Sequence, residues 1–197
     1  RTTLKMAGAT LAAAAAPGAL LAQAEGPLVL ACDAITTLDP AFTRATGGNL
    51  SVSSQVMSSP TTLTETGELV GALATSWEGN SPTQFTFHLN PDAKFENGKP
   101  LDASVIVWNF NRMMDPELKA TADTDFDLID RVEAPDPHTA VFHTKSPWLE
   151  LPRRMCWFFF LEPSWAEEAN PKVEVMASGA YRVVSFDPGG DVVLEAN

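Results

Sequence analysis

The chain has 197 residues, of which 25 are Asp or Glu and 13 are Lys or Arg, giving a formal net charge of −12. A surface of this sign repels nucleic acid and anionic lipid, so the charge excludes the basic proteins that bind either of them. Eleven Phe and five Trp exclude an intrinsically disordered chain, and the length is enough for one or two domains with a packed core.

The N-terminal segment has the pattern of an export signal. Arg1 and Lys5 are its only charges, and an apolar, alanine-rich run follows at residues 6–21. Residues 22–24, Ala-Gln-Ala, then have the small-x-small form of a leader-peptidase site. We therefore predict that residues 1–24 are a signal peptide that export removes, which leaves 11 basic and 25 acidic residues and a net charge of −14.

Two alternatives concern the same segment. A membrane anchor would need a longer apolar run, because this one is too short and too rich in alanine to span a bilayer well. The opening residues RTTLK also resemble the end of a twin-arginine export motif, with Arg1 as the second arginine. Because the chain begins with Arg and not with Met, we expect it to be incomplete at its start.

Short elements separated by turns are predicted up to residue 69. Residues 28–32 are an apolar run typical of a buried strand, and residues 38–40, Leu-Asp-Pro, end it. Residues 43–54 are polar and contain two consecutive glycines, which predicts a loop leading into a helix. Residues 61–69 predict a strand followed by a turn.

The next stretch predicts a strand, a tight turn and a helix. Apolar and polar side chains alternate over residues 85–89, which indicates a half-buried strand, and Asn97-Gly98 supplies the positive φ angles of a tight turn. Asp102 is placed to cap a helix that ends at residues 115–116, Asp-Pro. One buried stripe of that helix consists of Ile106, Phe110 and Met113.

The rest of the chain alternates short strand and helix patterns, and no internal repeat is present. The predicted elements are strands at 128–133 and 139–144 joined by a turn at 135–138, a helix at 148–155, a buried strand at 156–161, a helix start at 163–168, and a hairpin of residues 180–186 and 191–195. This mixture predicts a mixed α and β fold, of the α/β or α+β class.

The two cysteines, Cys32 and Cys156, allow one disulfide in an exported protein. Cysteines this far apart in sequence are more often small buried hydrophobic residues, so we predict free thiols and keep the disulfide as the alternative. The sequence LVLAC, ending at Cys32, also resembles a lipoprotein box. It follows residues 25–27, Glu-Gly-Pro, and not an apolar run, so a buried strand is the preferred interpretation.

No motif of an enzyme or of a metal site occurs in the sequence. A nucleophile elbow, a His-Glu-x-x-His helix, a phosphate-binding glycine loop and a Cys-x-x-Cys pair are all missing. The spacing of His88, His138 and His143 matches no closed metal site, and His88 and His143 are expected to face solvent from strands. The sequence therefore favours a protein that is not an enzyme and needs no cofactor, and a secreted hydrolase with an unrecognised site is the alternative.

Five motifs occur in an order that resembles one known family. They are Leu-Asp-Pro at residues 38–40, QVMSSPTTLTETGELVGALATSWE at 55–78, FTFHLNPDAKFENGKPLDASVIVWNFNR at 85–112, IDRVEAPDPHTAVFH at 129–143, and ASGAYRVVSFDPGGDVVLEAN at 177–197. Together they resemble the extracellular solute-binding proteins of ABC importers, family 5, the peptide- and nickel-binding type.

The resemblance implies a fold and a division into domains. The fold would be that of a class II-like periplasmic binding protein, with only the N-terminal lobe present and the C-terminal lobe missing. Residues 25–52 and 156–197 would form the first domain of this lobe. Residues 53–155 would form a smaller domain inserted into it, and the ligand would bind between this lobe and the missing one.

The resemblance also implies a function. The chain would be the periplasmic, monomeric binding component that captures a small solute and delivers it to an ABC permease in the inner membrane, which works with its ATPase. A peptide is the expected ligand, with nickel chelates, opines and sugars as alternatives. A chaperone or a signalling receptor built on the same fold is the alternative from another class.

Two stretches are expected to face the ligand cleft by the same resemblance. Arg44 could bind a ligand carboxylate or be a solvated loop charge, and Trp157 could stack on a ligand or pack in the core. The loop at residues 117–127 could border the cleft and offer its acids to an amine. The candidate ligand-binding residues are Thr43, Arg44, Thr46, Gly48, Cys156, Trp157 and Phe159.

Overall fold

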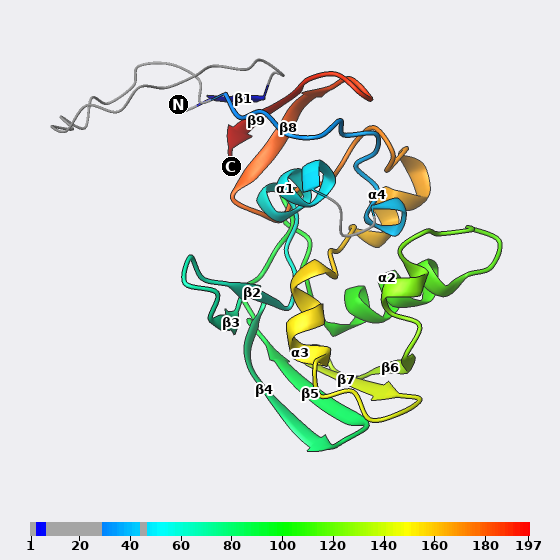
Figure 1. Cartoon of the computed structure of the whole chain (residues 1–197). Helices are drawn as coiled ribbons and strands as arrows, with labels where there is room; N and C mark the ends of the chain where they lie inside the picture. The colour runs from blue at the N-terminus through cyan, green and yellow to red at the C-terminus, as the bar shows by residue number, and fades with distance from the viewer. Residues whose placement is uncertain (1–2, 7–28, 44–46) are drawn as a thin grey trace, which may run out of the picture.

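The structure, a computed structural model, describes residues 3–6, 29–43 and 47–197 of the chain. Its helices and strands form two groups, one above the other in Figure 1. Of the predicted signal peptide, the structure describes only β1 (Thr3–Met6), and the remainder lies outside the described residues. Within the described ranges, none of the helices has the length and apolar character that crossing a bilayer requires.

A four-stranded antiparallel sheet forms the base of the lower group. Its strands, in spatial order, are β4 (Ala74–Ser81), β5 (Gln84–Leu89), β7 (Thr139–Thr144) and β6 (Ile129–Asp136). In β5, Phe85, Phe87 and Leu89 are buried and His88 is exposed, which confirms the predicted strand. Thr86, predicted on the polar side with His88, is buried as well, and its hydroxyl donates to the Asn80 side chain over 2.6 Å. Pairing of β6 with β7 confirms the two strands predicted at residues 128–144.

The helix α2 (Ala103–Met114) covers this sheet and packs on β6 and β7 (Figure 1). The Asp102 side chain accepts hydrogen bonds from the backbone N–H groups of Ser104 at 2.9 Å and Val105 at 3.4 Å, so the predicted cap is confirmed. Gly98 has a φ of +80°, as the predicted tight turn requires. The predicted stripe is buried too, at Ile106, Phe110 and Met113.

Several short elements complete the lower group. They are β2 (Thr61–Leu63), β3 (Leu69–Gly71), the 3₁₀ turn η2 (Asp123–Asp125), α3 (Leu151–Arg154) and the 3₁₀ turn η3 (Met155–Trp157). The helix predicted at residues 148–155 is therefore shorter than expected. Pro152 lacks an N–H group and is tolerated only in the first turn of a helix, so α3 begins at Leu151.

The upper group contains a three-stranded antiparallel sheet. Its strands are β1, β9 (Val192–Ala196) and β8 (Tyr181–Phe186), in that order. The 3₁₀ turn η1 (Pro40–Phe42) and the helices α1 (Gly47–Val56) and α4 (Pro163–Glu168) belong to the same group. The predicted C-terminal hairpin and the predicted helix at residues 163–168 are both confirmed.

The buried strand predicted at residues 28–32 is wrong for residues 29–32, which the structure describes. They form no strand, and Val29 and Leu30 are 49% and 42% exposed. In this structure the edge of β9 that faces away from β8 is occupied by β1, a strand of the predicted signal peptide, and residues 29–32 pair with no described strand. The apolar run is thus extended on the surface, and Cys32 is exposed with it.

The predicted buried strand at residues 156–161 is also wrong, although its burial is correct. Residues 156–157 end η3, and residues 158–161 pair with no strand. Both backbone groups of Leu161 instead bond the buried side chain of Asn109, whose Nδ2 and Oδ1 lie 2.9 Å from the Leu161 carbonyl oxygen and amide nitrogen. One side-chain amide therefore replaces a neighbouring strand.

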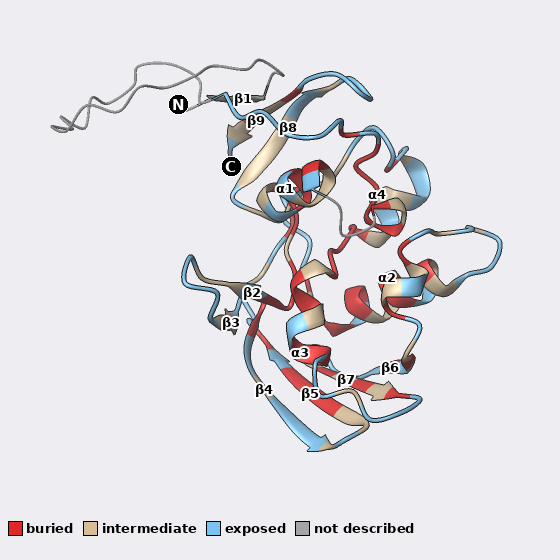
Figure 2. Cartoon of the chain, viewed as in Figure 1, coloured by how far each residue is buried: buried red, intermediate tan, exposed pale blue. Residues whose placement is uncertain are grey.

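Alternate side chains of this run enter two different hydrophobic cores. Figure 2 shows buried segments in red in both the upper and the lower group. Phe158 and Phe160 belong to the large core, which also contains the fully buried side chains Phe87, Ile106 and Phe142. Phe159 and Leu161 belong to the small core. The other buried members of the small core are Ile35, Leu38, Val52, Val56, Met57, Val192 and Leu194. Side chains of an extended segment point alternately to opposite sides. Each side of this run enters one of the two cores, so both sides have to be apolar.

Two polar clusters join the groups. The first is a bidentate ion pair, in which the Arg112 guanidinium of α2 donates to the two Asp39 carboxylate oxygens over 3.0 and 2.7 Å. Asp39 also accepts a hydrogen bond from the N–H of Ala41 at the start of η1. The Leu-Asp-Pro segment is thereby fixed against α2, and its aspartate is almost completely buried.

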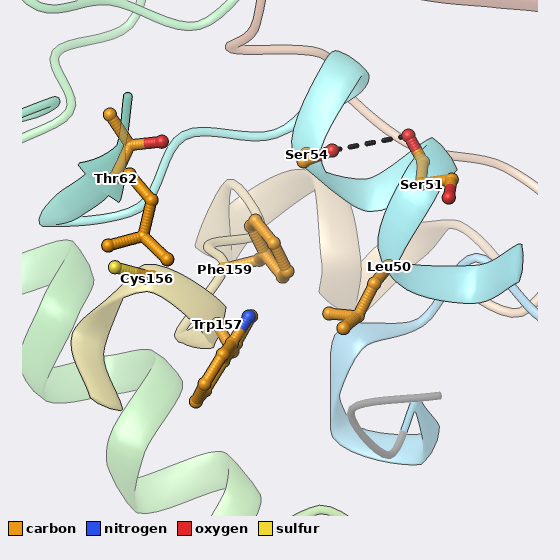
Figure 3. Close-up of a pocket in the computed structure, with 8 residues that line it drawn as sticks. Leu50, Ser51, Ser54, Thr62, Cys156, Trp157 and Phe159 are labelled. Atoms are coloured by element: carbon orange, nitrogen blue, oxygen red, sulfur yellow. Dashed lines mark hydrogen bonds between the residues drawn. The ribbon is translucent and has the colours of Figure 1, made fainter. Parts of the chain in front are cut away.

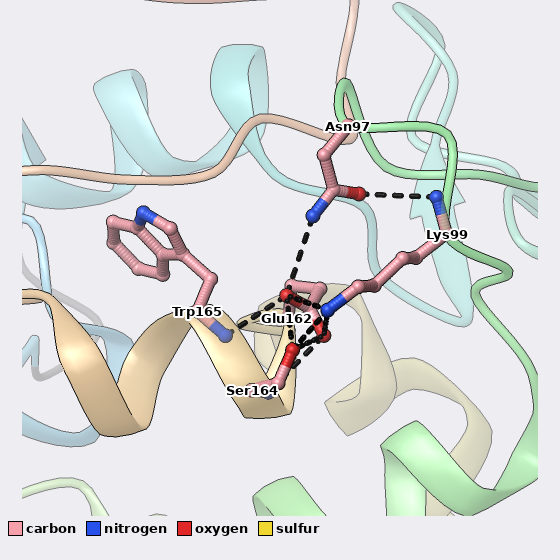
Figure 4. A network of polar contacts seen from close by, with 5 residues as sticks. All are labelled: Asn97, Lys99, Glu162, Ser164 and Trp165. Atoms are coloured by element: carbon pink, nitrogen blue, oxygen red, sulfur yellow. Dashed lines mark hydrogen bonds and ion pairs between the residues drawn. The ribbon is translucent and has the colours of Figure 1, made fainter.

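The second cluster surrounds the buried carboxylate of Glu162 (Figure 4). Glu162 caps α4 by accepting from the N–H groups of Ser164 and Trp165, and the Lys99 ammonium lies 3.3 Å from its Oε2. Asn97 donates to the same oxygen over 3.3 Å. Burial works to raise the pKa of Glu162, but the hydrogen bonds from Ser164, Trp165 and Lys99 outweigh it and hold the pKa below its ordinary value.

Candidate functional site

A surface hollow of about 260 Å³ lies where α1, β2 and η3 meet (Figure 3). Its lining residues come from α1 of the upper group, from β2 and η3 of the lower group, and from Phe159 just after η3. Its lining residues are Leu50, Ser51, Ser54, Thr62, Leu63, Cys156, Trp157 and Phe159. Three of them, Cys156, Trp157 and Phe159, are candidate residues predicted from the sequence.

The helix α1 supplies one wall of the hollow. Val52 and Val56 turn into the small core, which leaves the face with Leu50, Ser51 and Ser54 toward the hollow. The Ser51 hydroxyl donates to the Gly47 carbonyl over 3.0 Å, and the Ser54 hydroxyl to the Ser51 carbonyl over 3.2 Å. Each hydroxyl oxygen keeps acceptor capacity for a ligand, since a hydroxyl is one donor and two lone pairs.

Gly48 lies beside the hollow and not in it. It is buried at the start of α1, where an added Cβ would lie 2.2 Å from the carbonyl oxygen of Asp33. It borders a separate, shallow hollow of about 430 Å³ that shares Ser51 with the first. The glycine therefore allows the close approach of the segment before η1 to α1.

The thiol of Cys156 is nearly buried at the opposite wall. Its Sγ lies 3.5 Å from the Thr61 hydroxyl oxygen, and that hydroxyl also lies 2.6 Å from the carbonyl oxygen of Pro152. Both Cys156 and Cys32 are free, so the alternative of a disulfide is wrong. Cys156 thus behaves as a small hydrophobic residue on the wall of the hollow.

Trp157 and Leu50 separate the hollow from a second, smaller cavity. The cavity has a volume of about 10 Å³ and is lined by Thr43, Leu50, Asp125, Phe126, Arg154 and Trp157. The Arg154 guanidinium carbon lies 5.2 Å from the centre of the Trp157 ring, which is the distance of a cation–π contact. Trp157 is half-buried. Its side chain lines both the hollow and the smaller cavity, and its ring contacts the Arg154 guanidinium.

Thr43 and the loop at residues 117–127 meet at this smaller cavity. The Thr43 hydroxyl donates to the Pro40 carbonyl over 3.1 Å and is buried, so the residue shapes the cavity more than it offers a free donor. The loop is fixed where the N–H groups of Thr121 and Ala122 donate to the Ala41 carbonyl over 2.9 and 3.0 Å. This contact places the Asp125 side chain at the cavity.

Five of the seven candidate residues therefore lie at or beside the two spaces. Arg44 and Thr46 lie outside the described residues. The sequence reasoning missed Leu50, Ser51 and Ser54, whose spacing on a helix would have placed them on one face. It also missed Arg154, Thr62 and Leu63, because short elements carry no periodicity from which to read a face.

A family model for bacterial extracellular solute-binding proteins, family 5 middle, matches residues 68–197. The periplasmic oligopeptide-binding protein OppA of Haemophilus influenzae is 33% identical over 177 residues, which cover 74% of this chain and 31% of that protein.

Two solved structures resemble the fold. Burkholderia pseudomallei OppA superposes with a TM-score of 0.77 at 20% identity, over 84% of this chain and 37% of that one. MoaA of A. tumefaciens R10, in complex with mannopinic acid, superposes with a TM-score of 0.71 at 25% identity, over 84% and 35%. The chain thus spans about a third of the length of these proteins.

Proposed function

Because the chain belongs to the bacterial extracellular solute-binding proteins of family 5, we propose that it captures a small solute outside the cytoplasm and delivers it to the permease of an ABC importer. The ligand class that we favour is a peptide, since a similar protein, OppA of Haemophilus influenzae, is an oligopeptide-binding protein. An opine is the second candidate, because mannopinic acid is bound by the similar protein MoaA.

The observation that carries the proposal is the hollow at α1, β2 and η3. It combines the ring of Trp157 and apolar side chains with the hydroxyls of Ser51, Ser54 and Thr62, a mixture typical of small-molecule sites. A volume of about 260 Å³ suits one or two residues of a peptide. We propose that this hollow is one wall of the ligand cleft and that a second lobe of the full-length protein supplies the other.

The two cores support the domain division proposed for this lobe. Residues 53–155 carry most of the large core, and residues 25–52 and 156–197 carry most of the small core. Asp39–Arg112 and Glu162–Lys99 join the two parts by buried carboxylates, so we propose that the lobe moves as one unit when the cleft closes.

The role that we propose is binding without turnover. The support for this role is that similar proteins, such as OppA of Haemophilus influenzae, are binding proteins. Incubating the full-length protein with a bound peptide and analysing the mixture by mass spectrometry tests this. Recovery of the intact peptide is expected, and accumulation of cleaved peptide would support the hydrolase alternative.

Titration calorimetry with the full-length protein tests the proposed site. Pools of tripeptides and mannopinic acid serve as ligands, and Trp157→Ala is compared with Trp148→Ala, a half-buried tryptophan of the large core. Only Trp157→Ala is expected to weaken binding, by about tenfold or more. Equal affinities of the two variants would show that the hollow is not the binding site.

The N-terminus of the exported protein tests the proposed location. If residues 1–24 are a signal peptide, mass spectrometry of the periplasmic fraction gives a first residue near Glu25. An uncleaved leader on soluble exported protein would contradict the proposal.

A further inference from the structure

We propose that Arg154, held against Trp157 at the edge of the hollow, binds a carboxylate group of the captured ligand. The inference rests on the solute-binding function proposed above and adds the chemistry of one end of the ligand. It assigns a role to a charged side chain that sequence reasoning did not select.

The position of Arg154 is fixed by its neighbours. It is the last residue of α3, its backbone N–H donates to the Glu150 carbonyl over 2.9 Å, and its guanidinium carbon lies 5.2 Å from the centre of the Trp157 ring. Stacking on an aromatic ring orients the planar guanidinium and leaves its edge N–H groups free to donate. An arginine placed in this way loses little conformational entropy when a two-oxygen acceptor arrives.

No acceptor of this chain neutralises the arginine within the described ranges. Asp125 lines the same cavity, but no ion pair joins it to Arg154, and among the described residues no hydrogen bond or ion pair uses the guanidinium. A half-buried guanidinium without a hydrogen-bonding partner is costly unless water or a ligand supplies one. The aspartate also adds a negative charge that disfavours a doubly charged group, so a carboxylate fits better than a phosphate.

The size of the cavity agrees with a single carboxylate oxygen. A volume of about 10 Å³ is room for one water-sized atom, and Leu50 and Trp157 divide it from the hollow of about 260 Å³. In Figure 3 the ring nitrogen of Trp157 lies on the side of the indole that faces Leu50 and Phe159. A ligand whose body fills the hollow could therefore reach past the indole edge with one acidic group.

Two sources of this chemistry are consistent with the proposed function. A peptide offers its terminal carboxylate, and an opine such as mannopinic acid is itself a carboxylic acid. The shared feature is a carboxylate next to a body that fits the hollow. The probes are therefore tripeptide pools with a free C-terminus, the same pools with an amidated C-terminus, and mannopinic acid.

The experiment compares two adjacent arginines in the full-length protein. Arg154→Gln and Arg153→Gln each remove one positive charge from the same helix, but Arg153 is exposed and does not line the cavity. We expect Arg154→Gln to weaken binding of free-acid tripeptides by about 10- to 100-fold, the size of a lost charge-assisted hydrogen bond. Arg153→Gln is expected to change it by less than about twofold, since long-range charge effects are screened by salt.

Amidation provides a second test that does not depend on the mutants folding equally well. For the wild type, the amidated pools should bind about as weakly as the free-acid pools bind to Arg154→Gln. For Arg154→Gln, amidation should make no further difference, because both changes remove the same contact. Arg154→Lys should recover part of the affinity, since it keeps the charge and loses the planar fork.

The possible results separate the inference from the proposed function. Equal loss in Arg153→Gln and Arg154→Gln, or equal binding of amidated and free peptides, would overturn the carboxylate site and leave solute binding intact. Binding of mannopinic acid alone, abolished by Arg154→Gln, would support the site and replace the peptide by an opine. Failure of every free-acid probe to bind would overturn both.

Discussion

The large core and the small core differ in how far apart in the sequence their residues lie. The buried members of the large core all fall between Leu73 and Phe160, in one continuous stretch. The small core joins residues 35–57, 159–161 and 192–194. Long loops must close before such distant segments meet, so we expect the small core to depend more on the rest of the protein.

The two cores also differ in what fills them. Phe87, Phe142, Phe158 and Phe160 form a chain of ring contacts in the large core, with centroids 5.3 to 6.5 Å apart. The small core has one buried Phe, Phe159, and is surrounded by half-buried side chains. The candidate hollow lies against this second core, as expected if binding sites draw on the less rigid part of a fold.

The largest expected effect comes from comparing adjacent phenylalanines across the two cores. Phe158→Ala should cost about 4 kcal/mol of unfolding free energy, because it leaves a cavity among the rings of Phe126, Phe142 and Phe160, and Phe158 does not line the hollow. Phe159→Ala should cost less, about 2–3 kcal/mol, and also weaken ligand binding. Denaturant unfolding and calorimetry on the full-length protein measure both quantities, and a larger stability loss in Phe159→Ala would reverse the comparison.

Asn109 tests whether the two cores are coupled. Asn109→Ala should destabilise the protein by about 3 kcal/mol, since it leaves the buried N–H and C=O of Leu161 without partners. Asn109→Asp is the matched comparison, because it keeps an acceptor for the N–H but turns a carboxylate oxygen toward the Leu161 carbonyl where the amide donated. It should cost at least as much as alanine, since it also buries a charge without a partner. A single unfolding transition in wild type that splits into two in Asn109→Ala would show that this side chain couples the cores.

Glu162 makes the stability of the contact between the upper and lower groups depend on pH. Its pKa in the folded protein lies below the ordinary value of 4.5, so its carboxylate stabilises the fold above that pH. The stabilisation is lost as the pH falls through the lowered pKa. Glu162→Gln should cost about 2 kcal/mol at pH 7 and flatten the fall of the stability profile below about pH 4.5. An unchanged acid limb would mean that the carboxylate contributes nothing to the acid sensitivity.

The smallest effect on stability is expected at the cap of α2, away from the contacts that join the upper and lower groups. Asp102→Ala removes the acceptor for two backbone N–H groups and should cost about 1 kcal/mol. Because Asp102 lies away from the hollow, ligand affinity in the full-length protein should stay the same. Lost affinity at unchanged stability would mean that the segment around Asp102 contacts the ligand.

Local chemistry made much of the fold predictable. The strand at residues 85–89, the cap at Asp102 and the buried stripe of α2 are determined by neighbours in sequence, and the structure confirms all three, with Thr86 of the strand buried against expectation. Gly98 likewise takes the positive φ of its turn. The order of the five motifs also gave the family, because such a series depends on spacing along the chain and needs no coordinates.

The candidate site was only partly predictable. Cys156, Trp157 and Phe159 do line the hollow, but the resemblance to the family suggested them, not their own pattern. Ser51, Ser54 and Arg154 were missed, because a serine on a helix or an arginine at its end has no special local signal. Their importance comes from what lies opposite them.

The sequence by itself determined the elements with strong periodicity, the family and the excess of negative charge. Only the tertiary structure decided that residues 29–32 form no strand and that the apolar run at 158–161 divides its side chains between two cores. It also decided that Arg154 stacks on Trp157 beside a cavity. The physical reason is the range of the interactions. Caps, turns and amphipathic faces act within a few residues, whereas strand partners, core membership and an unpaired charge depend on segments that meet only after the chain has folded.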